Sequence, residues 1–254
     1  MHVERCGADA RAVFVHGFAG DVSSWDALWD ASDDALAAVR YDLRGFGASH
    51  AKDNRPFTHA DDLLALLDAL AIETADLIGV SMGGGVALNF ALSYPKRVRR
   101  LVLISPGMVA WEWSEAWHET WAPIVAVAQR GGMEQARALF IAHPMFDSVR
   151  EGPAGVALRD AVARYSGAHW IADHHAMMGP DVERLHALDA PTLLLNGADD
   201  LDEFKLIGDL IEGSAPNVRR IVYPGGGHML HMQCPVRCAR DIAAFLNAPD
   251  LPTS

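Results

Sequence analysis

Six short apolar runs recur along the chain, separated by longer segments in which apolar residues return every three or four positions. Each run is brief and rich in valine, isoleucine or leucine. Continuous apolar character of this kind is typical of strands that are buried on both faces, as in a parallel sheet. We therefore predict buried strands at residues 12–16, 37–42, 75–80, 100–105, 192–196 and 219–224.

The segments between these runs predict helices. In residues 59–70, four leucines fall on one helical face, and acidic residues stand near the start, where the helix dipole favours them. Further helices are predicted at residues 84–95, 202–213 and 235–247. Strands and helices that alternate in this way predict an α/β fold with a mostly parallel, doubly wound central sheet.

Residues 107–188 interrupt this alternation, because no convincing strand pattern occurs in them. The segment holds five of the seven tryptophans and several methionines and histidines. Insertions between two strands cost little chain entropy. We predict a core domain formed by residues 1–106 and 189–254 and a helical cap, or lid, inserted at residues 107–188.

The composition narrows the possible partners. Lysine and arginine number 21 against 33 acidic residues, a formal charge of −12, which disfavours binding to nucleic acid or to an anionic membrane surface. The three cysteines, Cys6, Cys234 and Cys238, favour a reducing compartment over a disulfide framework. The first residues contain no signal-peptide pattern. We expect a soluble, cytoplasmic protein that is a monomer or a homodimer.

A serine flanked by glycines stands where a predicted strand becomes a helix. Residues 79–83 read Gly-Val-Ser-Met-Gly, with Ser81 at the centre. Glycine-flanked serines also occur in ordinary turns, but a sharp strand-to-helix turn would expose the Ser81 hydroxyl at the carboxyl edge of the sheet. Ligands bind at that edge in open α/β folds. We predict that Ser81 is a nucleophile.

A serine hydroxyl needs a base, and a base needs an orienting group. His228 lies in a glycine-rich loop after one predicted strand, and Asp199 and Asp200 follow another. Because the carboxyl ends of parallel strands share one edge, we predict His228 as the base. Either aspartate could orient the imidazole, and we prefer Asp200.

An oxyanion that forms on the substrate needs at least two N–H donors aimed at it. The amide of Met82, directly after the nucleophile, is one candidate. The loop after the first predicted strand, His-Gly-Phe-Ala-Gly, supplies the other, and Phe18 is its best candidate. We expect His16 and Gly17 to shape this loop.

At these residues the chain resembles the α/β-hydrolase fold family. The resemblance extends over nearly the whole length, through VFVHGFAG, YDLRGFGAS, IGVSMGGGVAL, LLLNGADD and PGGGHMLHMQCP. It implies a Ser81–His228–Asp200 triad, a helical cap, and no metal or organic cofactor. It also implies scaffolding roles for the Asp-Leu-Arg-Gly turn. The family usually opens with an antiparallel hairpin, which we expect to be short or partly missing here.

Within that family the chain looks like the small capped hydrolases, which include 3-oxoadipate enol-lactonases, carboxylesterases and carbon–carbon bond hydrolases. We predict a serine hydrolase that cleaves a small carboxylic ester or lactone. The nearer alternative is a carbon–carbon bond hydrolase or a lyase-type synthase that uses the same triad. The farther alternative is a non-catalytic ligand-binding protein.

The cap sequence indicates an apolar pocket. Trp113, Trp117 and Trp121 follow one another at four-residue steps, which predicts one helical stripe. Such stripes usually pack in a core, and we expect part of this one to contact the substrate. A methionine-rich lid would favour an uncharged or aromatic substrate. We expect His174 and His175 to lie at the surface, with no assigned role.

Overall fold

A computed structural model describes residues 1–7, 9–32, 37–50, 55–176 and 178–249 of the 254-residue chain. Within these residues one seven-stranded sheet has the order β1-β3-β2-β4-β5-β6-β7. The strands are β1 (Val3–Cys6), β2 (Ala12–Val15), β3 (Ala38–Tyr41), β4 (Ala75–Val80), β5 (Val98–Ile104), β6 (Thr192–Gly197) and β7 (Val218–Tyr223).

Six of the strands run parallel to one another. Strand β2 pairs with β3 and β4, and β5, β6 and β7 follow in turn. Each begins and ends within two residues of its prediction. Strand β1 pairs antiparallel to β3, with Val3 opposite Tyr41. It is the only strand before β2 in the described residues, at the place where we expected the family's opening hairpin to be short or partly missing. The predicted α/β fold with a mostly parallel sheet is therefore confirmed.

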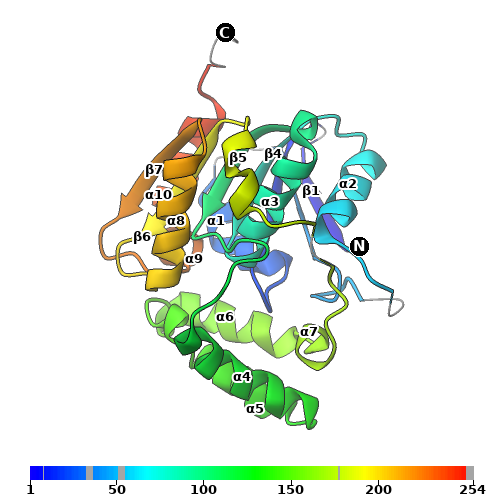
Figure 1. The fold of residues 1–254 in the computed structure, drawn as a ribbon, viewed down its shortest axis with the longest axis vertical. Coiled ribbons are helices and arrows are strands. Elements are labelled where there is room, and N and C mark those ends of the chain that lie inside the picture. The colour runs from blue at the N-terminus through cyan, green and yellow to red at the C-terminus, as the bar shows by residue number, and fades with distance from the viewer. Residues whose placement is uncertain (8, 33–36, 51–54, 177, 250–254) are drawn as a thin grey trace.

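Helices cover both faces of the sheet (Figure 1). Alternate strand residues belong to the apolar clusters on the two faces. Val13 and Val15 belong to the larger apolar cluster, together with buried residues of three helices, whereas Ala12 and Phe14 belong to the smaller cluster on the opposite face. The first face carries α2 (His59–Ala69), α3 (Met82–Ser93) and α8 (Asp202–Ser214), and the second α1 (Asp26–Asp30) and α10 (Pro235–Leu246). This period-two alternation gives the central parallel strands two buried faces, whereas the edge strand β7 is partly exposed.

Between β5 and β6 the chain forms helices only, within the residues described there. They are α4 (Glu115–Gln129), α5 (Met133–Ile141), α6 (Gly152–Arg164) and α7 (Ala168–Ile171), with short 3₁₀ turns Pro144–Phe146 and Val182–Ala187. Figure 1 shows these four helices gathered beyond one end of the sheet. They lie over the strand ends that carry the predicted site residues. The division of the chain into core and cap domains stays a prediction.

The 3₁₀ turn Val22–Trp25 and the short helix α9 (Leu230–Gln233) complete the elements near that end of the sheet. None of the helices in the described segments combines the length and apolar character needed to cross a membrane.

Candidate active site

Ser81 stands at the junction of β4 and α3 in a backbone conformation that few non-glycine residues adopt. Its φ is 53° and its ψ is −120°. The Ser81 amide donates to the Ile104 carbonyl at 3.0 Å, and the Ser81 carbonyl accepts from the Gly107 amide at 2.8 Å. These two bonds tie the turn to the end of β5, so the neighbouring strand maintains a conformation that is costly on its own.

Two glycines allow the turn to be this tight. A Cβ atom on Gly83 would lie 2.1 Å from the carbonyl oxygen of Val15, and one on Gly79 would lie 2.3 Å from the carbonyl oxygen of Gly83. Both separations are far below van der Waals contact. Helix α3 therefore starts directly against the sheet because neither position carries a side chain.

His228 and Asp200 come together from the ends of two neighbouring strands. Nδ1 of His228 lies 3.1 and 3.2 Å from the two carboxylate oxygens of Asp200, and both side chains are almost fully buried. Because a carboxylate only accepts hydrogen bonds, this contact places the proton on Nδ1 and leaves Nε2 as the bare nitrogen. Asp200 also accepts from the Leu201 amide at 2.7 Å. Asp199, the other candidate, is exposed.

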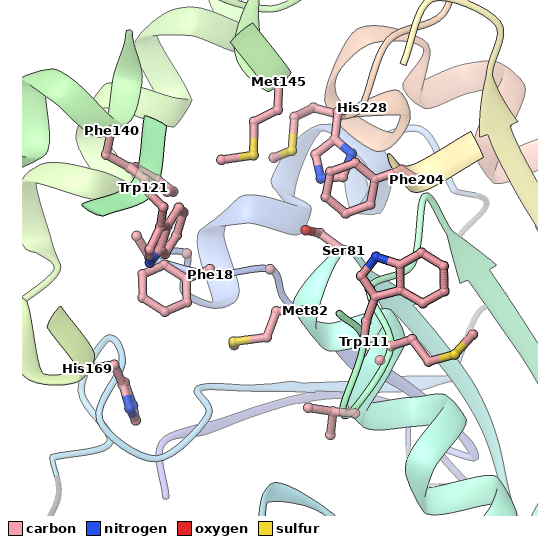
Figure 2. A pocket seen from close by; sticks show the side chains of 18 of the residues that line it. Phe18, Ser81, Met82, Trp111, Trp121, Phe140, Met145, His169, Phe204 and His228 are labelled. Carbon is pink, nitrogen blue, oxygen red and sulfur yellow. The ribbon is translucent and has the colours of Figure 1, made fainter. Parts of the chain in front are cut away.

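Ser81 and His228 face the same cavity (Figure 2). The Ser81 hydroxyl is directed toward the His228 ring. The His228 Nε2 atom is buried and has no hydrogen-bonding partner among the residues that the structure describes. Catalytic hydrogen bonds are often long until substrate binds. The structure thus brings all three predicted side chains to one place, with the Asp200–His228 contact formed.

The loop after β2 is held by the ring of His16. Its Nε2 accepts from the Leu43 amide at 3.0 Å, so the proton is on Nδ1, which donates to the Gly17 carbonyl at 2.8 Å. Burial lowers the pKa of His16, which agrees with a neutral ring. Phe18 follows in this loop and lines the cavity near Met82 (Figure 2). The first amides of a helix such as α3 lack intrahelical partners, which leaves the Met82 N–H available.

An ion pair connects the same loop to the helices above it, with the Asp21 carboxylate buried and the Arg164 side chain half exposed. Asp21 accepts from Arg164 of α6 at 2.8 Å and 3.2 Å. Burial by itself would raise the pKa of Asp21, but the hydrogen bonds from Arg164 and Ser23 outweigh it and hold that pKa below its usual value. The carboxylate is therefore ionised, and α6 is fastened to the loop that carries Phe18.

The cavity above Ser81 has a volume of about 660 Å³ and a mostly apolar lining. Trp113, Trp117 and Trp121 all line it, as part of the stripe that the sequence indicated. The ring centroids of Trp113 and Trp117 are 4.2 Å apart, and those of Trp117 and Trp121 are 5.5 Å apart. The expectation of a single helical stripe was wrong at one end, because Trp113 precedes α4, whose N-cap is Ser114.

Several lining residues were not expected from the sequence. Phe204, four positions after Asp200, packs on the His228 ring with centroids 4.0 Å apart. His175, which we expected at the surface, lines the cavity together with His59 and His169. Four methionines were expected in the lid. Met145 lines the cavity, Met133 and Met178 are not among its lining residues, and Met177 lies outside the described residues. Phe204 lies in the first turn of α8, close after the strand end that carries Asp200, whereas the positions of the histidines gave no such signal.

No cluster of three or more histidine, cysteine, aspartate or glutamate side chains in the described part of the chain has the geometry of a metal site. The residues at the cavity supply a hydroxyl, an imidazole oriented by a carboxylate, and backbone amides. Such a set can form and break an acyl bond on the serine.

The chain is similar to proteins that are named for different reactions. It is 27% identical over 253 residues to a putative 2-succinyl-6-hydroxy-2,4-cyclohexadiene-1-carboxylate synthase of Bacillus subtilis, covering 95% of this chain and 92% of that protein. It is 37% identical over 122 residues to a 2-hydroxymuconate semialdehyde hydrolase of Pseudomonas sp., covering 45% and 43% of the two chains.

The fold is also shared with solved structures. An enol-lactonase from Burkholderia xenovorans superimposes with a TM-score of 0.83 at 22% identity, covering 97% of this chain and 96% of that one. The model of the alpha/beta hydrolase fold matches residues 13–148, more than half of the chain. On this match and the sheet described above, the chain belongs to the alpha/beta hydrolase fold family.

Proposed function

We propose that the protein is a serine hydrolase that cleaves a small, uncharged carboxylic ester or lactone. The contact of Asp200 with His228, whose ring lines the same cavity as Ser81, is the observation that supports it most strongly. Membership of the alpha/beta hydrolase fold family supports a hydrolase in general. The choice of ester or lactone as the substrate is argued from the cavity.

In the proposed reaction Ser81 attacks the carbonyl carbon while His228 Nε2 takes the hydroxyl proton. Asp200 keeps the imidazole in the required tautomer and stabilises its charged form. The amides of Met82 and Phe18 donate to the oxyanion. His228 then gives the proton to the leaving alkoxide, which departs as an alcohol.

The second half of the reaction releases the acyl group. Water attacks the acyl-Ser81 carbonyl and gives a proton to His228, and the tetrahedral intermediate then collapses. The Ser81 oxygen leaves and takes that proton back, so a carboxylic acid is formed and the serine is regenerated. With a lactone, the alcohol and the acid are the two ends of one product.

The charge of the cavity lining favours an uncharged substrate. Among its described residues the lining has no lysine or arginine, and its only carboxylate is that of Asp173. A carboxylate-bearing substrate would have to leave water without a cation to pair with, which is costly. An ester or lactone with apolar groups loses little on entering and gains from contact with the tryptophans.

A second candidate is cleavage or formation of a carbon–carbon bond by the same residues. The similarity to the synthase and to the semialdehyde hydrolase favours it. Both of those proteins are named for carboxylate compounds. The lack of a lysine or arginine in the described lining is the specific observation against this candidate.

A substrate panel tests the proposal. The purified protein is given short p-nitrophenyl esters, small lactones and ring-cleavage dienones, and each is repeated with the Ser81→Ala variant. We expect turnover of the esters or lactones that falls at least about a thousandfold in the variant. Turnover of dienones alone would establish the second candidate, and ester turnover that survives in Ser81→Ala would refute the nucleophile.

A further inference from the structure

One end of the cavity differs in chemistry from the rest. His59 of α2, His169 of α7, and Asp173 and His175 on the segment that leads from α7 back to the core line the same cavity as Ser81. Figure 2 shows His169 on the far side of Phe18 and Met82 from His228. We call these four residues the histidine end. The catalytic chemistry proposed above uses none of them.

The histidine end is continuous with the aromatic wall of the cavity. The ring centroids of Phe18 and His169 are 6.4 Å apart, and those of His169 and His59 are 6.0 Å apart. His59 and His175 stack at 4.6 Å. A substrate whose carbonyl lies at Ser81 can therefore extend past Phe18 along the cavity and reach the imidazole rings of the histidine end.

His169 has a structural role, because both of its ring nitrogens are occupied. Nε2 lies 2.9 Å from the Arg44 carbonyl oxygen, and Nδ1 lies 3.1 Å from the Asp173 carboxylate. Asp173 also accepts from the His175 amide at 2.9 Å. Helix α7 and the following segment are thus fixed against the core, and this fixes where His175 stands.

The ring nitrogens of His59 and His175 do not have such partners among the described residues. His59 is almost fully buried, and its Nδ1 atom has no hydrogen-bonding partner within the described residues. The His175 ring stacks on it, and no described residue is hydrogen bonded to that ring either. A polar group left without a partner is unfavourable, so a ligand oxygen that forms a hydrogen bond with either ring gains affinity from that bond.

The charges around these two rings decide which ligand atom fits. Burial lowers the pKa of His59 well below its usual value and also lowers that of His175, so both rings are neutral near pH 7. A neutral imidazole offers one N–H donor and one bare nitrogen. The adjacent Asp173 carboxylate, which contacts His169, disfavours an anion, and the described lining has no lysine or arginine that would pair with one.

We propose that the histidine end is a binding subsite for an uncharged oxygen, a carbonyl or a hydroxyl, on the part of the substrate remote from the scissile bond. His59 and His175 supply the hydrogen bonds, and His169 with Asp173 holds His175 in place. The proposal deepens the proposed hydrolase function and rests on it in one respect: the same cavity receives the substrate. Its substrates are therefore esters or lactones that are apolar in the middle and polar at one end.

The test compares p-nitrophenyl octanoate with its keto analogues, in which one carbonyl replaces a methylene at the fourth to the seventh carbon. Binding is measured to the Ser81→Ala protein, so that affinity is read without turnover. One keto position is expected to bind about fivefold to tenfold tighter than octanoate. The half ester of the eight-carbon dicarboxylic acid is expected to bind no tighter than octanoate.

The histidines are then changed in the same background. His59→Phe and His175→Phe should each reduce the keto preference to about one, whereas His175→Gln, which keeps a donor and an acceptor, should retain part of it. The matched control is His186→Phe, an exposed histidine outside the cavity lining, which should keep the full preference. Circular dichroism checks folding, and His175→Phe carries the test if the His59 variant does not fold.

The outcomes separate the subsite from the reaction. Equal binding at every keto position, binding of none of the compounds, or a preference that survives in both phenylalanine variants would overturn the subsite. Tighter binding of the half ester would overturn its preference for an uncharged group. Keto preference in Ser81→Ala, together with no ester hydrolysis by the unmodified protein, would overturn the hydrolase function and leave the subsite in place.

Discussion

At the scale of single residues, the site depends on side chains whose positions follow from the ends of strands. Ser81 adopts a positive φ directly after β4, and Asp200 and His228 follow β6 and β7. A sparsely populated backbone conformation with positive φ costs a non-glycine residue on the order of 1 kcal/mol or more. A sharp turn that exposes the serine hydroxyl forces this conformation on the serine, so the cost is expected at this position.

The two neighbouring aspartates give a matched pair of variants. Asp200 contacts His228 Nδ1, whereas Asp199 is exposed. We expect Asp200→Asn to lower kcat for ester hydrolysis by about 10⁴-fold, because an amide no longer enforces the tautomer that His228 needs. Asp199→Asn should stay within about twofold, as exposed substitutions usually do. Steady-state kinetics measure both variants. The assignment would be contradicted if kcat fell equally in the two variants, or fell more in Asp199→Asn than in Asp200→Asn.

The sequence located some of these residues and not others for a physical reason. Ser81 stands directly after β4, and Asp200 and His228 lie in the loops that follow β6 and β7, so sheet geometry carries all three to one edge. His59 begins a helix on the core and His175 follows a helix of the cap. Their meeting depends on the path of α7 and on the Asp173 contacts, which no local pattern of residues encodes.

At the scale of elements, the loop after β2 is held from both sides. His16 fixes it to the core through the Gly17 carbonyl, and Arg164 of α6 fixes it to the helices above through Asp21. The Phe18 amide lies between these two attachments. The position of α6 is therefore coupled to the geometry of the proposed oxyanion site.

This coupling predicts an effect of Arg164→Ala on catalysis. Removing the guanidinium leaves the Asp21 carboxylate buried without its cation, and we expect the loop to shift and kcat/KM to fall by about tenfold or more. Arg159→Ala is the control on the same helix, because Arg159 bonds only to the Arg150 carbonyl among the contacts described for it. Equal kcat/KM for the two variants would disprove the coupling.

The pH dependence of the Arg164 effect has a defined sign. The pKa of Asp21 is depressed in the folded protein, so its ion pair contributes stability above the unfolded-state pKa of about 4 and loses it as the pH falls further. The difference in free energy of unfolding between the unmodified protein and Arg164→Ala should shrink below about pH 4. Urea titrations at several pH values measure it, and a difference that grows in acid would contradict this account.

The pattern of apolar residues predicted some helices and strands more accurately than others. Buried parallel strands leave a continuous apolar run, so their ends were predicted closely, and α8 and α10 were equally visible. Strand β1 was not predicted, because its residues Val3–Cys6 are half-buried or exposed and read as polar. In the cap, the helical character was predicted but the four separate helices were not, since short half-exposed helices give weak periodicity.

At the scale of the whole molecule, buried histidines link stability to pH. Burial, with the nearby His228 as a smaller contribution, lowers the pKa of His143 to about 4 and that of His231 to about 3. Burial also lowers the pKa of His59. The unfolded chain binds protons at these histidines near pH 6.5, whereas the folded chain does not.

This difference predicts acid sensitivity. Because the unfolded state binds more protons below about pH 6.5, stability must fall as the pH is lowered from about 7.5 to about 5.5. We expect the midpoint of thermal unfolding to decrease over that range, and His231→Phe to show a smaller decrease. Differential scanning calorimetry measures both. A midpoint that stays constant or rises on acidification would contradict the neutral, buried state of these histidines.

The central claim is that Ser81 is an activated nucleophile. The most direct measurement is the intact mass of the protein after treatment with a fluorophosphonate, followed by peptide mapping. The account predicts one phosphonyl adduct, located on Ser81, that is absent from Ser81→Ala and forms far more slowly in His228→Ala. No adduct on the folded protein, or an adduct on another residue that persists in Ser81→Ala, would contradict it.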